Sequence, residues 1–278
     1  MSSVPSPAHH TKHVPLLQYP FRNASFHISQ LDNGHTNGSA LWLGAQCLSL
    51  YLADLYATKS KSLLSDGCKP RAIELGSGVG LTALALASMG WDVLATDLPP
   101  VIDSVLSGNV ARNVANLPAG SGSVQVRTLD WTVPPNEWSW DHPTFVAHPD
   151  PLVACAAPAC STGSPSTPIG PPFQLIVSAD TVYSASLVSP FLRTLHHLCT
   201  LSRDASPSRR PPPVYVCLER RDPALVVQTL SQAKQEWGFL VERVPHKKVH
   251  KAMVKGGLNW SSEDWEGIEI WKFMLRTT

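Results

Sequence analysis

The stretch "AIELGSGVGL", residues 72–81, decides how the rest of the sequence is interpreted. Two apolar residues lead to Glu74, and glycines follow at alternate positions, Gly76, Gly78 and Gly80. A short apolar run that ends in glycines is typical of a strand that turns tightly into a helix. Such a turn can hold a dinucleotide, a phosphate or a nucleoside without phosphate, and each ligand implies a different chemistry.

Length and composition narrow the class of protein. The chain has 278 residues, 43% of them hydrophobic, which fits one large domain or two small ones. Lys+Arg number 22 and Asp+Glu 21, so the global charge indicates neither a nucleic acid nor a membrane partner. The apolar runs are shorter than the ~20 residues of a membrane helix, and the N-terminus lacks the apolar core of a signal peptide. The six cysteines form no CxxC pair, so we expect a reducing location, cytoplasmic or nuclear.

Short apolar runs alternate with helical patterns along most of the chain. Five runs predict buried strands: residues 71–75, 91–97, 124–131, 173–180 and 214–219. The segments between and before them predict helices: one after an N-cap at Ser39, one at 81–89, one from Ser189 and Pro190 to about residue 201, and one at 223–238. This alternation predicts an α/β fold with a doubly wound, mostly parallel sheet.

The two ends of the chain and one internal segment differ from this pattern. Residues 239–244 and 267–275 predict two more strands without a helix between them, hence an antiparallel C-terminal hairpin and a seven-stranded sheet. Ten of the 25 prolines lie in residues 132–172, which we predict to be a mostly disordered insertion. The expected organisation is an N-terminal extension over 1–35 and a single domain over 36–278.

The spacing of the glycines indicates which ligand the turn holds. Ligands of doubly wound sheets bind at the carboxyl ends of the strands. The turn reads GxGxG after an acidic residue, whereas dinucleotides favour GxGxxG and phosphates GxxxxGK[ST]. Asp97 ends the second strand, where a carboxylate can accept both hydroxyls of a ribose. This pattern resembles the loop that binds S-adenosylmethionine (SAM) in Rossmann-like methyltransferases, which makes cofactor candidates of Glu74, Gly76, Ser77, Gly78, Gly80 and Asp97. The alternative is a tight turn and an acid that caps the next helix.

Four further segments narrow the resemblance. They are "GSALWLGA" (38–45), "TLDW" (128–131), "SADTVY" (178–183) and "SPFLRTLHHL" (189–198). In this order they resemble the seven-β-strand protein-lysine methyltransferases, methyltransferase family 16, over about residues 36–235. The resemblance implies a Rossmann-like class I methyltransferase fold with SAM as cofactor. It also implies that Trp42, Trp131 and Ala179 contact the cofactor, that Asp180 orients the incoming amine, and that Tyr183 gives it an aromatic wall.

Each of these residues also has a structural interpretation. Trp42, Trp131 and Tyr183 fit core or rim packing, and Asp180 fits a cap on the next helix. Glu219 lines an acceptor channel or forms a surface ion pair with Arg220 or Arg221. Methyl transfer requires no metal, and the eleven histidines show no metal-ligand spacing.

The function predicted from the sequence is methyl transfer from SAM to a lysine amine of a protein substrate, with no nucleic acid or membrane partner. A small-molecule N-methyltransferase and a non-catalytic SAM-fold interaction protein stay open as alternatives, and the glycine spacing disfavours an NAD oxidoreductase. The target protein, its lysine, the number of methyl groups and the oligomeric state are left open by the sequence.

Overall fold

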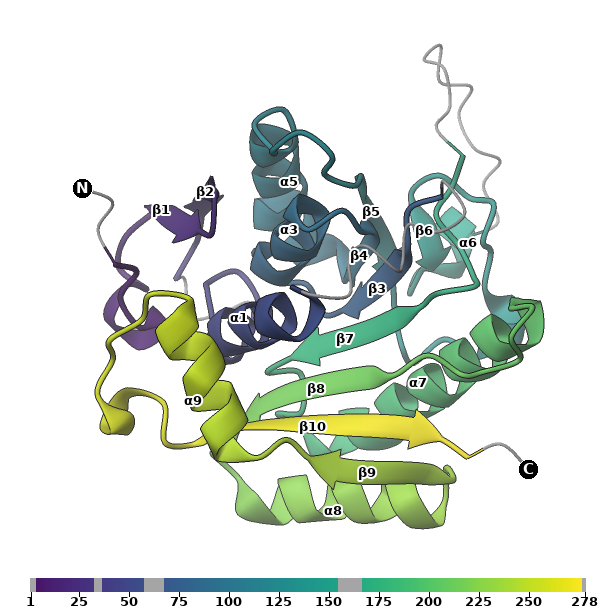
Figure 1. The fold of residues 1–278 in the computed structure, drawn as a ribbon. Coiled ribbons are helices and arrows are strands. Elements are labelled where there is room, and N and C mark those ends of the chain that lie inside the picture. Colours follow the sequence, from purple (N-terminus) through teal and green to yellow (C-terminus); the bar gives the residue numbers. More distant parts are fainter. Residues whose placement is uncertain (1–3, 33–36, 58–67, 155–166, 277–278) are drawn as a thin grey trace.

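The computed structural model describes residues 4–32, 37–57, 68–154 and 167–276, and shows a central sheet with helices on both faces (Figure 1). The eight strands run in the order β6-β5-β4-β3-β7-β8-β10-β9. β10 is antiparallel to β8 and β9, and the other pairs are parallel. Their bounds are β3 Arg71–Leu75, β4 Asp92–Asp97, β5 Val124–Leu129, β6 Phe145–Ala147, β7 Leu175–Ala179, β8 Val214–Glu219, β9 Phe239–Arg243 and β10 Ile268–Leu275. The predicted α/β fold with a doubly wound, mostly parallel sheet is confirmed.

Two hydrophobic cores cover the two faces of the sheet. Successive residues of a strand point to opposite faces, so Leu175 and Val177 belong to one core and Ile176 to the other. Figure 1 shows α1, α3 and α5 over the first face and α7 and α8 over the second. The longer helices are α1 Leu43–Tyr56, α3 Leu81–Ser88, α5 Ser107–Val114, α7 Ala185–Ala205, α8 Pro223–Gln235 and α9 His246–Lys255. The short ones are η1 Ala8–His10, α4 Pro99–Val101, η2 Ile102–Leu106, η3 Pro135–Glu137, α6 Pro151–Ala154 and η4 Ser262–Asp264.

Two predicted helix starts are wrong. α7 begins at Ala185 with Pro190 inside it, five residues before the predicted first helical residue. α1 begins at Leu43, because Trp42 is extended and Ser39 lies too far upstream to cap it. The cap comes instead from a distant residue, Asp180, whose side chain accepts a hydrogen bond from the backbone N–H of Gly44 at 2.7 Å. Local sequence signals do not show a cap that arrives from another strand.

The C-terminal strands pair as predicted, but the connection between them is different. β10 pairs with β9 in antiparallel register, which confirms that part of the prediction. The expectation of no helix between them is wrong, since α9 stands there and packs on α1. Its buried residues are Val249, Ala252 and Met253, whereas its lysines are exposed. The helix was not predicted because its many lysines outnumber the three apolar residues that recur at helical spacing.

The described part of the proline-rich insertion is structured, so the prediction of disorder is wrong there. β6 adds an eighth strand beside β5, and its three residues are buried. Arg127 of β5 is 1% exposed and donates to the carbonyl oxygens of Trp140 at 2.8 Å, His142 at 3.4 Å and Ile169. Residues 155–166 of the insertion lie outside the described residues. A buried arginine thus fixes both ends of the insertion to the sheet.

The predicted N-terminal extension packs into the hydrophobic core on the first face of the sheet. β1 Leu16–Phe21 and β2 Ala24–Ser29 form an antiparallel pair whose Phe21 and Phe26 are buried. Two asparagines of α5 hold β2 by paired hydrogen bonds, Asn113 to the backbone of His27 and Asn109 to that of Ser29. The hairpin is therefore tied to the helical layer that covers the first face of the sheet. Within the described residues, no helix is long and apolar enough to cross a membrane.

Arg127→Met tests how the insertion is held. We expect this variant to lose about 3 kcal/mol of unfolding free energy, because the buried carbonyl oxygen of Ile169 and the part-buried ones of Trp140 and His142 lose their donor, at up to ~1–3 kcal/mol each, and the new side chain offsets part of the loss. Urea denaturation measures this. The exposed Arg210→Met is the matched control and should unfold like the wild type. Equal stability of the two variants would mean that Arg127 does not hold the insertion.

Candidate active site

The glycine turn is held against two other segments of the chain. Gly78 has φ +54°, and a Cβ atom there would lie 3.0 Å from the carbonyl oxygen of Gly38. Its N–H donates to Oδ2 of Asp97 at 2.8 Å. Ser77 N–H donates to the carbonyl oxygen of Thr96 at 2.9 Å. Gly78 is thus required both by its backbone conformation and by the close approach of the 37–38 segment.

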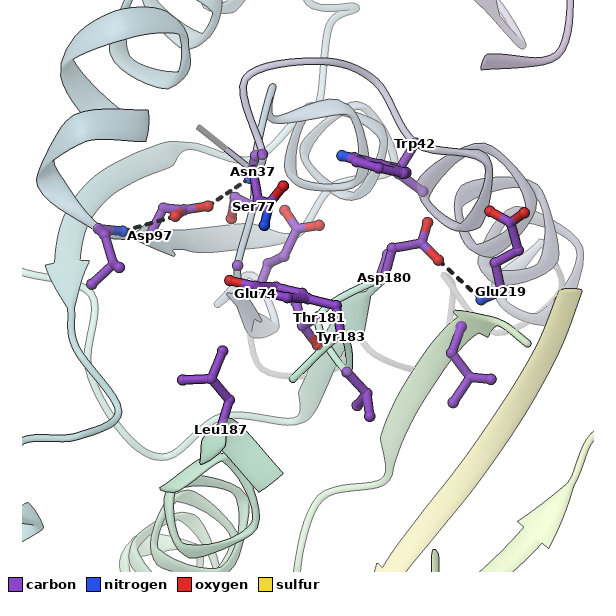
Figure 2. Close-up of a pocket in the computed structure, with 18 of the residues that line it drawn as sticks. Asn37, Trp42, Glu74, Ser77, Asp97, Asp180, Thr181, Tyr183, Leu187 and Glu219 are labelled. Atoms are coloured by element: carbon purple, nitrogen blue, oxygen red, sulfur yellow. Dashed lines mark hydrogen bonds between the residues drawn. The ribbon is translucent and has the colours of Figure 1, made fainter. Parts of the chain in front are cut away.

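A cavity of about 290 Å³ opens above this turn, at the carboxyl ends of the parallel strands (Figure 2). Ten of the eleven predicted site residues line it: Trp42, Glu74, Gly76, Ser77, Gly78, Asp97, Trp131, Ala179, Asp180 and Tyr183. Gly80 does not. It precedes α3 with φ +87°, and a Cβ atom there would lie 2.9 Å from Cδ1 of Leu106. Gly80 serves the packing of the turn on η2.

Several lining residues were not predicted from the sequence. Asn37 and Gly38 come from the segment before α1, and Thr181 follows Asp180 with its hydroxyl 2.7 Å from that of Ser178. Leu187 lines the cavity from α7, and Leu225 from α8. These residues carry no motif of their own. Only their positions after a strand, or just before a helix, could have indicated them.

Asp97 connects the end of β4 to the glycine turn. Its Oδ2 accepts from Gly78, and its Oδ1 accepts from the N–H of Leu98 at 2.8 Å. Burial against the cavity wall raises the pKa of Asp97 to about 6 although both hydrogen bonds favour the ionised form. Each carboxylate oxygen has further acceptor capacity, so Asp97 can fix the turn and still receive hydroxyl donors from a ligand.

Glu74 is the most deeply buried acid of the cavity. It is 1% exposed, and its Oε2 has no hydrogen-bond partner among the described residues. Burial raises the pKa of Glu74 to about 8. A buried carboxylate with a free oxygen requires a proton or a cationic partner. The cavity is therefore built to receive a positive charge next to the glycine turn.

Asp180 joins three elements at the other end of the cavity. It lies directly after β7 with φ +56°, a conformation that aspartate tolerates better than most residues. Its Oδ2 accepts from Gly44 of α1, and its Oδ1 accepts from the N–H of Glu219 of β8 at 3.1 Å. Burial raises the pKa of Asp180 to about 6. The side chain does not cap the helix that follows it. It caps α1 and fixes α1 to β8.

Trp42 lies at the same end as Asp180, and we call this part of the cavity the Trp42 end (Figure 2). Its ring contacts two cations, Lys12 Nζ at 3.9 Å and Arg221 Cζ at 4.3 Å from the ring centroid. Arg221 also forms an ion pair with Glu219, and both line the cavity. The Trp42 end thus combines an aromatic face with carboxylates and an exposed arginine.

Tyr183 and Trp131 close the cavity from the sides. Tyr183 is 55% exposed, and burial of the rest together with the charge of Asp97 raises its pKa, whereas a hydrogen bond with Asn37 lowers it. Its hydroxyl therefore points toward the glycine turn. Trp131 packs on Phe191 with ring centroids 5.2 Å apart, and its Nε1 has no partner among the described residues.

Comparison with known proteins agrees with this geometry. The model of a family described as lysine methyltransferase matches residues 21–144. The predicted resemblance to protein-lysine methyltransferases is confirmed. Human methyltransferase-like protein 22 is 35% identical over 109 residues, 37% of this chain and 25% of that protein. The mouse protein N-lysine methyltransferase METTL21A is 28% identical over 188 residues, covering 68% of this chain and 67% of that one. The chain thus spans about a quarter of the first relative and two thirds of the second.

A third relative is mouse EEF1A lysine methyltransferase 3, 30% identical over 129 residues, 46% of this chain and 40% of that protein. Among solved structures, a TehB-like SAM-dependent methyltransferase from Corynebacterium glutamicum covers 84% of this chain and 98% of its own, at 15% identity and a TM-score of 0.43. A ribosomal protein L11 methylase from Lactobacillus delbrueckii covers 84% and 79%, at 13% identity and a TM-score of 0.40.

SAM, the cofactor that the resemblance implies, fits the residues present. Its amino acid part carries an ammonium group, which suits the free oxygen of buried Glu74. Its ribose hydroxyls suit the spare acceptor capacity of Asp97, and Trp131 offers an aromatic surface at the end of β5. Bound there, SAM would supply an activated methyl group.

Glu74→Gln should make the ligand-free protein more stable in alkaline buffer. The pKa of about 8 in the folded state lies above the ordinary 4.5, so the folded protein holds a proton that the unfolded chain releases. The stabilisation that this bound proton gives to the folded state is therefore complete below pH 4.5, falls as the pH rises, and is lost above pH 8. At pH 9 we expect the unfolding free energy of Glu74→Gln to exceed that of the wild type by on the order of 5 kcal/mol, at ~1.4 kcal/mol per pKa unit. Denaturant titrations at pH 5 and 9 measure this, with exposed Glu137→Gln as control. A pH-independent difference would contradict the assignment.

Asp97→Asn should weaken SAM binding. We expect at least a tenfold loss, since a charge-assisted hydrogen bond contributes ~1.5–3 kcal/mol. Calorimetry with SAM and with NAD measures this, and NAD should not bind to the wild type. Asp92→Asn is the matched control, because Asp92 begins the same strand and accepts from Ser123 away from the cavity. If the two variants bind SAM equally well, Asp97 does not contact the ribose.

Proposed function

We propose that the chain is a SAM-dependent methyltransferase that transfers a methyl group to a lysine side chain of a protein substrate. The observation that carries this proposal is that one cavity holds carboxylates at both ends, Glu74 and Asp97 beside the glycine turn and Asp180 at the Trp42 end. The names of the relatives, protein N-lysine methyltransferase and EEF1A lysine methyltransferase, support the same activity.

The reaction requires a lysine amine with a free lone pair facing the methyl group. A lysine has an unperturbed pKa of ~10.4, so it arrives as a cation. With a pKa of about 6, Asp180 is mostly ionised at neutral pH and attracts this cation to the Trp42 end. The amine gives one proton to solvent water at the exposed rim, and the carboxylate can then hold a remaining N–H and direct the lone pair. Attack on the methyl group would form the N–C bond as the methyl–sulfur bond of the sulfonium breaks, with its electron pair left on sulfur. Most of the rate enhancement then comes from positioning.

Asp180 is well suited to positioning because its own orientation is fixed. Gly44 donates to one carboxylate oxygen and Glu219 to the other, so rotation of the side chain would break a hydrogen bond. The ring of Trp42 already binds the ammonium of Lys12 and the guanidinium of Arg221, so a substrate ammonium gains this contact of ~0.5–2 kcal/mol only by displacing one of them. Tyr183 at the rim adds an aromatic wall over the entrance.

A protein substrate fits better than a small molecule, since Tyr183 and Arg221 leave the rim exposed and no separate lid domain covers it within the described residues. We also propose a cytoplasmic or nuclear location. The four described cysteines, Cys47, Cys68, Cys199 and Cys217, are free thiols, as a reducing compartment favours.

Asp180→Asn tests the role of the carboxylate. We expect turnover at saturating SAM to fall by about 100-fold or more, on the order of 3 kcal/mol, because the amide cannot attract the ammonium. The melting temperature should also fall, because the amide NH₂ replaces an oxygen that accepts from Gly44 or Glu219. Activity is therefore measured on the folded fraction, and SAM binding is measured separately.

The substrate for this assay comes from extract of cells that lack the protein, incubated with labelled SAM and analysed by mass spectrometry. Label on lysines of a protein supports the proposal, label on a small molecule supports the alternative acceptor class, and SAM binding without transfer supports a non-catalytic role. Asp92→Asn serves as the folded control. Wild-type turnover in folded Asp180→Asn would exclude Asp180 as the orienting group.

A further inference from the structure

Three metal-ligating side chains from opposite ends of the chain meet outside the cavity. His9 and His10 belong to η1, and Asp264 belongs to η4, just before β10. Their ligand atoms all lie within 4.8 Å of one another, and Nε2 of His9 is 3.7 Å from Oδ1 of Asp264. The two imidazole rings are 4.2 Å apart, centroid to centroid. Neither the lysine methyltransfer proposed above nor the packing of the core uses this group.

We propose that His9, His10 and Asp264 form a binding site for a divalent transition metal, with Zn²⁺ as the representative ion. Two imidazole nitrogens and one carboxylate oxygen are the ligands that Zn²⁺ accepts, and water completes a tetrahedral set. Bonds of ~2.0–2.1 Å place tetrahedral ligands ~3.4 Å apart. The His9–Asp264 pair is already close to that separation, and the ligand atom of His10 lies within 4.8 Å of both.

The surroundings of Asp264 fix it for this role. Its Oδ2 accepts from both the N–H and the hydroxyl of Ser261, at 2.9 and 3.0 Å, which leaves Oδ1 directed at His9. A ligating carboxylate held by outer hydrogen bonds is typical of metal sites, because those bonds orient the oxygen that binds.

The two segments are also held together without a metal. Trp260 donates from Nε1 to the carbonyl oxygen of Pro5 at 2.8 Å. Gln46 of α1 accepts from the N–H of Ala8 at 2.8 Å and donates to the carbonyl oxygen of Ser6 at 3.0 Å. The ligands therefore face each other before any ion arrives, which reduces the ordering cost of binding.

A metal here would act on the segment that reaches the cavity. Lys12 follows His10 by two residues, and its ammonium lies on the ring of Trp42. An ion that joins η1 to η4 restricts the N-terminal segment and so steadies Lys12 at the Trp42 end. The site is thus a structural clamp, distinct from methyl transfer.

Calorimetry with zinc chloride tests the proposal on the full chain, free of any histidine tag and treated first with a chelator. We expect one ion per chain, and at least tenfold weaker binding in His9→Ala and in Asp264→Asn, since each removes a ligand. His13→Ala and His250→Ala are matched controls. His13 lies on the same segment, and His250 stacks on Trp265 beside Asp264.

A second measurement separates a clamp from adventitious binding and guards against loss of fold. Far-UV circular dichroism and the metal-free melting temperature should be alike in all variants. Hydrogen exchange of residues 5–14 should slow with Zn²⁺ in the wild type and in the controls, and stay unchanged in His9→Ala. The proposal is overturned if no heat of binding is seen at about 1 mM zinc, or if the ligand variants and the controls bind alike.

Discussion

The carboxylate of Asp180 is the contact on which the site depends. One side chain at the end of β7 accepts from the start of α1 and from the end of β8, and so sets the separation of three elements that line one cavity. A carboxylate in this place costs free energy, because burial raises its pKa to about 6. A hydroxyl or amide could satisfy only part of this geometry, since two donors approach from opposite sides and both oxygens accept. The structure keeps a charge where packing alone would favour a neutral group.

The same principle applies to the cavity as a whole. Glu74 lies near the end of β3, Asp97 ends β4 and Asp180 follows β7, and burial raises the pKa of all three. Ionisation of buried acids costs free energy, so the ligand-free protein loses stability as the pH rises through these pKa values. A cationic ligand at either end offsets this cost. Perturbed carboxyls gathered in one cleft are typical of functional sites, where stability is given up for binding.

The sequence predicted the central strands, the doubly wound sheet and ten of the residues around the cavity, because buried parallel strands and glycine turns have strong local signals. It failed where distant contacts decide. Asp180 sets the start of α1, so the prediction of an N-cap at Ser39 was wrong. The composition of the proline-rich insertion indicated disorder, but the described part is ordered because Arg127 holds it. Gly80 belongs to the glycine pattern but packs on Leu106. The histidines that meet Asp264 show no ligand spacing, because that spacing exists only in the folded chain.

The hydrogen bond from Trp260 to the carbonyl oxygen of Pro5 has a consequence for synthesis on the ribosome. The N-terminal segment emerges first, yet its partners on α5 and on the loop before β10 emerge much later. Buried residues such as Phe21 and Phe26 must therefore wait, exposed or loosely collapsed, until α3 and α5, which pack on β2, have been made. The segment at Pro5 waits longer, because its partner Trp260 lies far along the chain. The hairpin can thus dock well before the residues that precede it are fixed.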